Sequence, residues 1–296
     1  MNKEIKIGIG LFVWNGQETI KETLLSLLHQ THKNFKIYIL DNQSSDDTVK
    51  IIKELLKIKK YKKKIKLIID KKKRSIPDAQ KFIMKKYLLK YKYCIIANDD
   101  DIYKSRYIEI LLRKIKLENL DMVYSLKKRI NSENKILKTK NYPLYGKKNL
   151  YFLNALNYLI YRNHWQVSFG LYKTRTYQES MKYYKYIDNS KTNYDNINMF
   201  YYLLNYKIEC SQNYLFLYRE KERSTIKRNK IINRYNDSIF SFFLIYKSQY
   251  YFTKIINKII WETNSVNIKK KLILTLSSLI TFLQKTTFYN IRKLLK

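Results

Sequence analysis

Glycine, proline and cysteine are all scarce in this chain of 296 residues, which has 5 Gly, 2 Pro and 2 Cys. The low glycine and proline counts exclude collagen-like and low-complexity linker architectures. The two cysteines, Cys94 and Cys210, exclude a disulfide framework, and no Cys/His cluster has the spacing of a zinc site. A reducing compartment is therefore expected.

Long apolar runs are also missing. The longest uncharged stretches, residues 149–161 and 272–284, fall short of the roughly 20 residues that a membrane-spanning helix needs. Residues 1–10 lack the basic start and the apolar middle of a signal peptide. The sequence therefore predicts a cytoplasmic protein whose apolar segments are buried or lie at an interface.

Acidic residues are few: the chain has 24 of them against 60 basic residues, which gives a formal net charge of +36. Such a charge suggests nucleic-acid binding, but most of the basic residues are lysines spread over the whole chain rather than arginines gathered beside aromatic side chains. The abundance of Lys, Asn, Ile and Tyr is also what AT-rich codons produce in any protein. We therefore favour an anionic membrane surface as the partner and consider nucleic acid the alternative.

The first third of the chain alternates strands with helices. Apolar runs predict strands at residues 5–13, 35–40, 65–69 and 93–97, with helices between them at residues 18–30, 46–57 and 77–87. This alternation predicts an α/β fold with a mostly parallel sheet flanked by helices. Ligands of such sheets bind beyond the carboxyl ends of the strands.

The later part of the chain has shorter elements. Helices are expected at residues 105–119, 154–161 and 195–204, strands at residues 122–126 and 213–219, and a loop followed by a strand within residues 164–172. Residues 131–148 are polar and are expected to form a loop. Residues 231–296 contain no Gly or Pro and are rich in Ile, Leu, Lys and aromatic residues, which predicts a helical C-terminal extension.

Three consecutive acids, Asp99, Asp100 and Asp101, follow the fourth strand. Their carboxylates repel one another, and a bound cation would relieve that repulsion. Hard carboxylate oxygens suit Mg²⁺ or Mn²⁺, and such an ion could also bind two phosphate oxygens of a ligand. An acidic turn that only caps the next helix is the alternative that the run by itself leaves open.

The order of motifs over residues 5–48 resembles the start of family 2 glycosyltransferases. In that family the first strand ends in a tyrosine-Asn-Gly turn, which is matched here by residues 14–16 (WNG). A helix then ends in Gln-Thr-aromatic-x-Asn-aromatic, matched by residues 30–35 (QTHKNF). The next strand ends in an Asp pair followed by Ser-x-Asp-x-Thr, matched by residues 41–48 (DNQSSDDT). The acidic run resembles the family's metal-binding motif.

The resemblance implies the GT-A fold and a site for a nucleotide-diphosphate sugar, with a UDP-sugar favoured. Trp14 would supply a stacking face, and Asp41 and Asn42 would contact the base or the ribose. The residues implied in donor binding are Phe12, Trp14, Asn15, Asp41, Asn42, Asp78 and Asp99. The metal ligands implied are Asp100 and Asp101, and a Mn or Mg ion there would neutralise charge on the leaving pyrophosphate.

An inverting transfer also needs a general base opposite the leaving group. In the family this acid opens a helix, and Asp195 matches it best, with Asp188 as the competitor. A helix N-cap is the structural alternative for Asp195. The same resemblance places His164, Trp165 and Gly170 on the acceptor side.

Two segments depart from the family's pattern. Residues 74–80 (RSIPDAQ) lack the glycines that are common after the third strand, and residues 218–221 (YREK) lack the histidine of a Tyr-Arg-x-His motif. A noncatalytic partner subunit with the same fold is therefore a further alternative. The retained Asp100 and Asp195 argue against it.

Together these features predict an inverting glycosyltransferase that moves a sugar to a hydroxyl of a glycan or lipid-linked acceptor in bacterial surface polysaccharide or lipooligosaccharide synthesis. Residues 1–104 are expected to form the nucleotide-sugar half of the GT-A domain, residues 105–230 its acceptor half, and residues 231–296 the extension. Lysines 269–271 precede the uncharged residues 272–284, so we expect the extension to dock peripherally on an anionic membrane, at the inner face of the plasma membrane. Packing on the catalytic domain or a contact in a homo-oligomer is the alternative.

Overall fold

The computed structural model describes residues 5–138, 145–146, 150–161, 169–186, 194–220 and 239–294. Contacts within the chain divide it into two compact units. The first comprises residues 1–141, 166–181 and 209–219, and the second comprises residues 142–165, 182–208 and 220–296.

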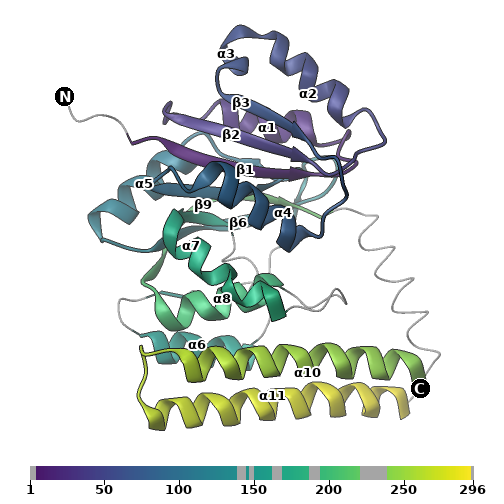
Figure 1. The fold of residues 1–296 in the computed structure, drawn as a ribbon, viewed down its shortest axis with the longest axis vertical. Coiled ribbons are helices and arrows are strands. Elements are labelled where there is room, and N and C mark those ends of the chain that lie inside the picture. Colours follow the sequence, from purple (N-terminus) through teal and green to yellow (C-terminus); the bar gives the residue numbers. More distant parts are fainter. Residues whose placement is uncertain are drawn as a thin grey trace. The chain divides into compact units, whose positions relative to one another are not determined.

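The first unit is built on one mixed sheet (Figure 1). Within the described residues the sheet has nine strands in the order β3-β2-β1-β4-β8-β6-β9-β5, with β7 paired to β6. Strands β1 to β4 are parallel, and β8 is antiparallel to both β4 and β6. The strands are β1 (Ile7–Val13), β2 (Phe35–Asp41), β3 (Ile65–Ile69), β4 (Tyr93–Asn98), β5 (Ile102–Tyr103), β6 (Met122–Ile130), β7 (Ile136–Leu137), β8 (Gly170–Lys173) and β9 (Ile208–Arg219).

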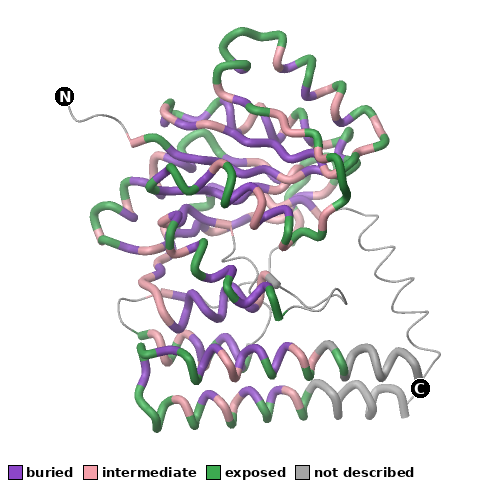
Figure 2. Tube along the Cα trace, viewed as in Figure 1, coloured by how far each residue is buried: buried purple, intermediate pink, exposed green. Residues whose placement is uncertain are grey.

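Helices flank this sheet because its central strands are apolar on both faces. Every residue of β1 except Phe12 is buried, as is typical of a parallel strand that is covered on both sides. Figure 2 shows the same burial along the neighbouring strands. The helical elements are α1 (Ile20–Leu28), α2 (Thr48–Lys57), α3 (Lys59–Lys62), α4 (Ile76–Ile83), the π-helical η1 (Met84–Leu88), α5 (Tyr107–Leu117) and α7 (Thr174–Ser180). The predicted α/β fold is confirmed.

Three elements of this unit differ from the sequence expectation. β6 runs to Ile130 rather than residue 126, because its last residues pair with β7 inside the segment expected to be a loop. β9 begins at Ile208 rather than residue 213, and α7 has no counterpart among the predicted elements. Lys127 makes β6 look polar in the sequence, yet this side chain is buried with Nζ 4.7 Å from the ring centroid of Tyr218. Tertiary packing therefore decides the length of these strands.

The described elements of the second unit are helical. They are α6 (Tyr151–Tyr161), the 3-10 helix η3 (Met181–Tyr186), α8 (Tyr194–Asn205), α10 (Ile239–Glu262) and α11 (Ile268–Leu294). α8 packs against α6 and α10, and α10 lies along α11 (Figure 1). The predicted helical C-terminal extension is confirmed. Across the described ranges, every helix is too short or too polar to cross a bilayer.

Candidate functional site

Three strand ends meet at one edge of the sheet in the first unit. β1 is parallel to β2 and to β4, and Val13 is paired with Asp41 while Phe12 is paired with Asn98. The segments that follow these strands therefore lie next to one another. This is the edge at which the sequence predicts ligand binding.

The turn after β1 is fastened to the loop after β2. Asn15 has a left-handed backbone, with φ at 51°, which Asn tolerates better than most residues. Its N–H donates to Ser44 Oγ at 2.9 Å, and its Oδ1 accepts from the N–H of Ser45 at 2.9 Å. The main-chain N–H and the side-chain oxygen of Asn15 thus hold the turn against the loop after β2.

Gly16 lets the same turn touch the acidic run. A Cβ atom at this position would stand 2.5 Å from Asp99 Oδ2, a distance that atoms cannot adopt without displacing the carboxylate. The N–H of Gly16 donates to Thr48 Oγ1 at 2.8 Å. The turn after β1, the start of α2 and the end of β4 are therefore in direct contact.

The Asp41 carboxylate at the end of β2 is buried and only half satisfied. Oδ2 accepts a hydrogen bond from the N–H of Ser44 at 3.2 Å, whereas Oδ1 has no hydrogen-bond partner within the described part of the chain. A buried acceptor without a partner is costly, so a ligand N–H that reached Oδ1 would gain affinity.

Trp14, one residue beyond the paired ends of β1 and β2, adds an aromatic face. Its side chain is 51% exposed, and Lys73 Nζ lies 3.9 Å from the ring centroid. Phe12 is only half-buried in the otherwise buried β1. An exposed indole close to an unsatisfied carboxylate has the chemistry to hold a heterocyclic base.

Asn42 and Asp78, which are also predicted to contact the nucleotide sugar, make hydrogen bonds within the protein. The Asn42 amide exchanges two hydrogen bonds with the main chain of Arg74, from Asn42 Nδ2 to the carbonyl at 3.0 Å and from the Arg74 N–H to Asn42 Oδ1 at 2.8 Å. Arg74 pairs with Asp70. Asp78 accepts from the Ser75 hydroxyl at 2.7 Å and sits in the first turn of α4, which Ser75 caps. Asn42 and Asp78 thus order the loop that follows β3.

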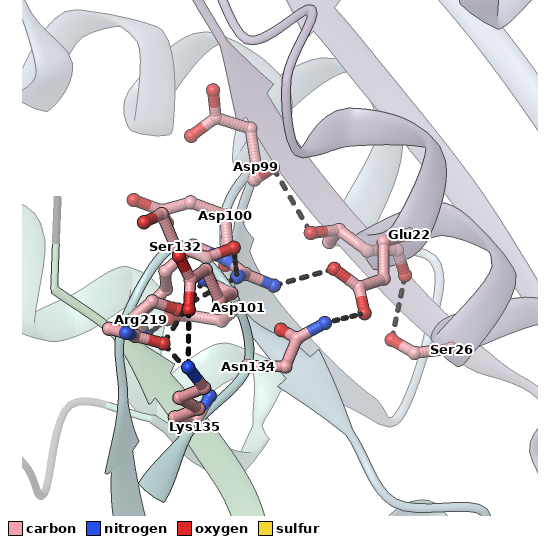
Figure 3. Close-up of polar contacts among 12 residues, drawn as sticks. Glu22, Ser26, Asp99, Asp100, Asp101, Ser132, Asn134, Lys135 and Arg219 are labelled. Carbon is pink, nitrogen blue, oxygen red and sulfur yellow. Dashed lines mark hydrogen bonds and ion pairs between the residues drawn. The ribbon is translucent and has the colours of Figure 1, made fainter. Parts of the chain in front are cut away.

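The three acids of the run differ sharply in their surroundings (Figure 3). Asp101 is fully buried, and its carboxylate accepts from the N–H of Arg219 at 3.1 Å and from Asn98 Nδ2 at 3.2 Å. Burial raises the pKa of Asp101 well above its usual range, and repulsion by Asp100 raises it further. Asp99 and Asp100 are only half-buried. Asp101 is therefore an internal structural group, and the accessible carboxylates are Asp99 and Asp100.

Arg219, at the end of β9, holds the acidic run in place (Figure 3). Its side chain is only 3% exposed, and Nε donates to the main-chain carbonyl of Asp100 at 2.9 Å. Nη2 pairs with Glu22 on α1 at 2.6 Å. Nη1 donates to the carbonyls of Asn131 and Ser132 at 3.1 Å each. One buried guanidinium therefore joins β9, α1, the β6–β7 hairpin and the acidic run.

In the sequence, Arg219 stands out only as part of residues 218–221 (YREK), which lack the histidine of the family's Tyr-Arg-x-His motif. The available signal was an arginine at the end of an apolar strand, residues 213–219, where a charge needs buried partners. Its partner Glu22 lies 197 positions away in the sequence, so the spacing gives no hint of the pair.

Arg219→Ala is expected to destabilise the first unit by about 3 kcal/mol, because three main-chain carbonyls and the Glu22 carboxylate lose a buried donor. The matched control is Arg106→Ala, which removes an exposed arginine whose partner Glu109 is also exposed. Urea denaturation of both variants makes the comparison. Equal, small shifts of the midpoint in the two variants would show that the Arg219 network contributes little to stability.

The two accessible carboxylates suit a hard divalent cation whose other ligands come from a bound substrate and from water. Throughout the described ranges, no group of three or more His, Cys, Asp or Glu side chains is placed to hold a metal ion. Mg²⁺ commonly takes one or two carboxylates and completes its shell with substrate phosphates and water. Asp99 and Asp100 can supply such a pair, whereas the Asp101 carboxylate is committed to donors within the protein.

The second unit carries the predicted base. Asp195 lies in the first turn of α8 and is half-buried. Its neighbour Asn196 accepts from the hydroxyl of Tyr158 on α6, through Oδ1 at 2.6 Å and the carbonyl at 3.2 Å, which fixes the start of the helix. The competitor Asp188 lies outside the described residues.

The acceptor-side candidates are only partly described. His164 and Trp165 lie outside the described residues. Gly170 opens β8, where a Cβ atom would stand 2.5 Å from the carbonyl oxygen of Val123 on β6. Close pairing of β8 with β6 accounts for this glycine, independently of any acceptor.

Comparison with known proteins identifies the family. The family model described as Glycosyl transferase family 2 matches residues 9–193, which is more than half of the chain. The chain belongs to glycosyl transferase family 2. The resemblance carried by residues 14–16, 30–35 and 41–48 is thereby confirmed.

Relatives of this family 2 chain are known in Rickettsia. An uncharacterized glycosyltransferase of Rickettsia conorii is 32% identical over 143 residues, which are 48% of this chain and 22% of that protein. A second, from Rickettsia felis, is 32% identical over 136 residues, 46% of this chain and 21% of that protein. The chain therefore spans about a fifth of the length of these curated relatives.

A solved structure shares the fold of this family 2 chain. The crystal structure of S. aureus TarS 1–349 in complex with UDP-GlcNAc superimposes with a TM-score of 0.67 and 14% sequence identity, covering 95% of this chain and 73% of that one. The same protein in complex with UDP gives a TM-score of 0.63. At this identity the likeness shows the fold alone.

Proposed function

We propose that the chain is an inverting glycosyltransferase that transfers a sugar from a UDP-sugar to a hydroxyl of its acceptor. The observation that carries the proposal is the buried Asp41 carboxylate, whose Oδ1 is unsatisfied and which lies at the same sheet edge as the exposed Trp14 ring. Uracil has an imide N–H that would satisfy this buried oxygen once the groups covering it move aside, and a flat face that can stack on the indole. Family membership and the fold support the same assignment.

The leaving group of this reaction is a nucleoside diphosphate, whose charge grows as the glycosidic bond breaks. Asp100, helped by Asp99, would hold a Mn or Mg ion, which when bound supplies positive charge next to the leaving oxygens. Arg219 keeps the main chain of Asp100 fixed through its 2.9 Å hydrogen bond. Gly16 keeps Asp99 against the turn after β1. The acids are thus pre-positioned before any donor binds.

The acceptor hydroxyl must lose a proton as it attacks the anomeric carbon. We assign this role to Asp195, which takes the proton on a carboxylate oxygen and leaves the sugar inverted. His164, Trp165 and Gly170 are proposed to lie on the acceptor side. A noncatalytic partner subunit would instead bind the donor without turnover.

The acceptor is proposed to be a glycan or a lipid-linked sugar in the synthesis of a bacterial surface polysaccharide or lipooligosaccharide. The protein would then work as a peripheral protein at the inner face of the plasma membrane. The scarcity of acidic residues beside many lysines supports an anionic surface.

The sharpest test of donor binding compares two pyrimidine nucleotides in a thermal-shift assay with Mn²⁺. UDP is expected to raise the melting temperature and CDP is not, because N3 of cytosine is an acceptor that faces the Asp41 carboxylate. Asp41→Ala should weaken UDP binding roughly 10- to 100-fold, the usual loss for a hydrogen bond to a charged group.

Asp47→Ala is the matched control, because this exposed acid on the same loop pairs with the exposed Lys50. It is expected to retain the UDP response. Equal responses to UDP and CDP would contradict recognition of uracil by Asp41. Salt-sensitive DNA binding without any response to nucleotides would favour the nucleic-acid alternative.

A further inference from the structure

α11 presents its apolar residues outward. Seven of its large apolar residues between positions 268 and 283 are 43% to 60% exposed. At about 100° per residue, these positions fall within an arc of about 140° on the helix surface and extend over roughly 22 Å. The members of this outer stripe are Ile268, Leu272, Ile273, Leu276, Leu279, Ile280 and Leu283.

The opposite face of α11 is buried and largely polar. Ser278 donates to Asn257 Oδ1 on α10 at 2.8 Å, and Thr281 donates to the carbonyl of Leu159 on α6 at 3.3 Å. Leu274 is the buried large apolar residue of this face. A helix that only packed on its neighbours would turn its leucines inward and its hydroxyl groups to water.

α10, the neighbour of α11, shows that ordinary arrangement. Its apolar residues Ile255, Ile256, Ile259 and Ile260 are all buried. Figure 2 shows exposed positions recurring along α11. The outward apolar stripe thus distinguishes α11 from the isoleucine-rich end of α10, and an apolar surface of this kind is typical of a partner-binding site.

We propose that the outer stripe of α11 docks on the surface of an anionic lipid bilayer, with the helix lying in the plane of the interface. The proposal deepens the peripheral location proposed above by naming the surface and the lipid class. An interfacial helix needs one apolar face flanked by cations and need not span the membrane.

The basic residues of α11 favour an anionic lipid surface as the partner that covers the outer stripe. The sequence of α11 contains no Asp or Glu, and its basic residues are Lys269, Lys270, Lys271, Lys285, Arg292 and Lys293. Lys269 is exposed and falls within the arc of the outer stripe. Trp261, at the end of α10, is 46% exposed and its carbonyl accepts from Lys271 Nζ at 3.0 Å, which places an aromatic residue near the start of the stripe.

A second copy of the chain fits this face less well. Two α11 helices packed through their stripes would bury the Lys269 side chain of each copy, and neither helix has an acid to pair with it. Anionic headgroups supply that missing negative charge.

The test is sedimentation of the full chain with vesicles of phosphatidylcholine, alone or mixed with phosphatidylglycerol. The wild type is expected to pellet with the mixed vesicles at low salt and to be released at high salt. The variant Leu276→Gln/Leu279→Gln/Leu283→Gln should bind about 100-fold more weakly, since three leucines no longer enter the interface. All three positions are exposed, so the helix itself should still pack.

The matched control is Leu117→Gln/Ile136→Gln, which removes two exposed apolar side chains from the first unit. It is expected to pellet like the wild type. Lys269→Glu, a second variant at an exposed position, should weaken binding to the mixed vesicles without touching the packed face of α11. It keeps the proposal testable if the triple variant unfolds, which circular dichroism would reveal.

Undiminished pelleting of the triple variant, or equal pelleting with pure phosphatidylcholine, would overturn the proposal. So would light scattering that shows a wild-type dimer dissociated by the triple substitution without any vesicle binding. The experiment is separate from donor chemistry, because Asp41→Ala should still bind vesicles and the triple variant should still respond to UDP.

Discussion

Replacing Asp100 with Asn is expected to abolish measurable glycosyl transfer and the dependence of UDP binding on Mn²⁺. The variant removes one negative charge from a half-buried carboxylate at the end of β4 and changes nothing in shape. An amide binds a hard divalent cation far more weakly than a carboxylate does. The fold should persist, because the Arg219 contact to this residue uses the main-chain carbonyl.

The measurement is a titration of Mn²⁺ against UDP-induced thermal stabilisation, run beside a turnover assay. Asp101→Asn is the informative companion, because the Asp101 carboxylate is buried and accepts from the protein. It should lower stability while the response to Mn²⁺ persists. If Asp101→Asn loses the response to Mn²⁺ and Asp100→Asn keeps it, Asp101 is the metal ligand and Asp100 is the structural group. Full activity of the wild type in a chelator would remove the metal from the mechanism.

Asp195→Asn is expected to lower kcat by roughly 10²–10⁴, the usual contribution of a general base. Because the base acts in the transition state, the apparent affinity for the donor should change little. The variant keeps the size of the side chain in the first turn of α8, so the helix should persist.

The control for this prediction is Asp188→Asn, since Asp188 competes for the same role in the sequence. Steady-state kinetics of both variants with saturating donor would separate them. A crippled Asp188→Asn beside an active Asp195→Asn would move the base to the earlier carboxylate. A loss confined to KM in Asp195→Asn would mark that residue as a binding or capping group.

The strands that position the site follow directly from the sequence. β1 and β4 are apolar up to their ends, β2 is interrupted only by Lys36 before it ends at Asp41, and polar residues follow each strand. The later strands are harder to predict because their bounds and the burial of their residues depend on contacts with segments far away in the sequence. Lys127 looks like a surface residue until β9 places Tyr218 beside it. β7 is two residues long and exists only by pairing with the end of β6.

The sequence predicts which residues lie at the candidate site, but it does not predict which of them are accessible to a ligand and which are held by other parts of the protein. The sequence places Asp99, Asp100 and Asp101 together, and only the fold separates the buried acid from the two accessible ones. Asn42 looks like a ligand contact because it follows Asp41, but its amide holds the Arg74 main chain. Both facts depend on partners far along the chain, which motif spacing does not encode.

The contact between Gly16 and Asp99 has a consequence for exchanging parts between members of the family. The turn after β1 and the acidic run fit each other at a distance that leaves no room for a methyl group. A chimaera that imported either segment alone would combine two surfaces shaped in different proteins. Donor preference is therefore best transplanted as one block, with the ends of β1, β2 and β4 moved together.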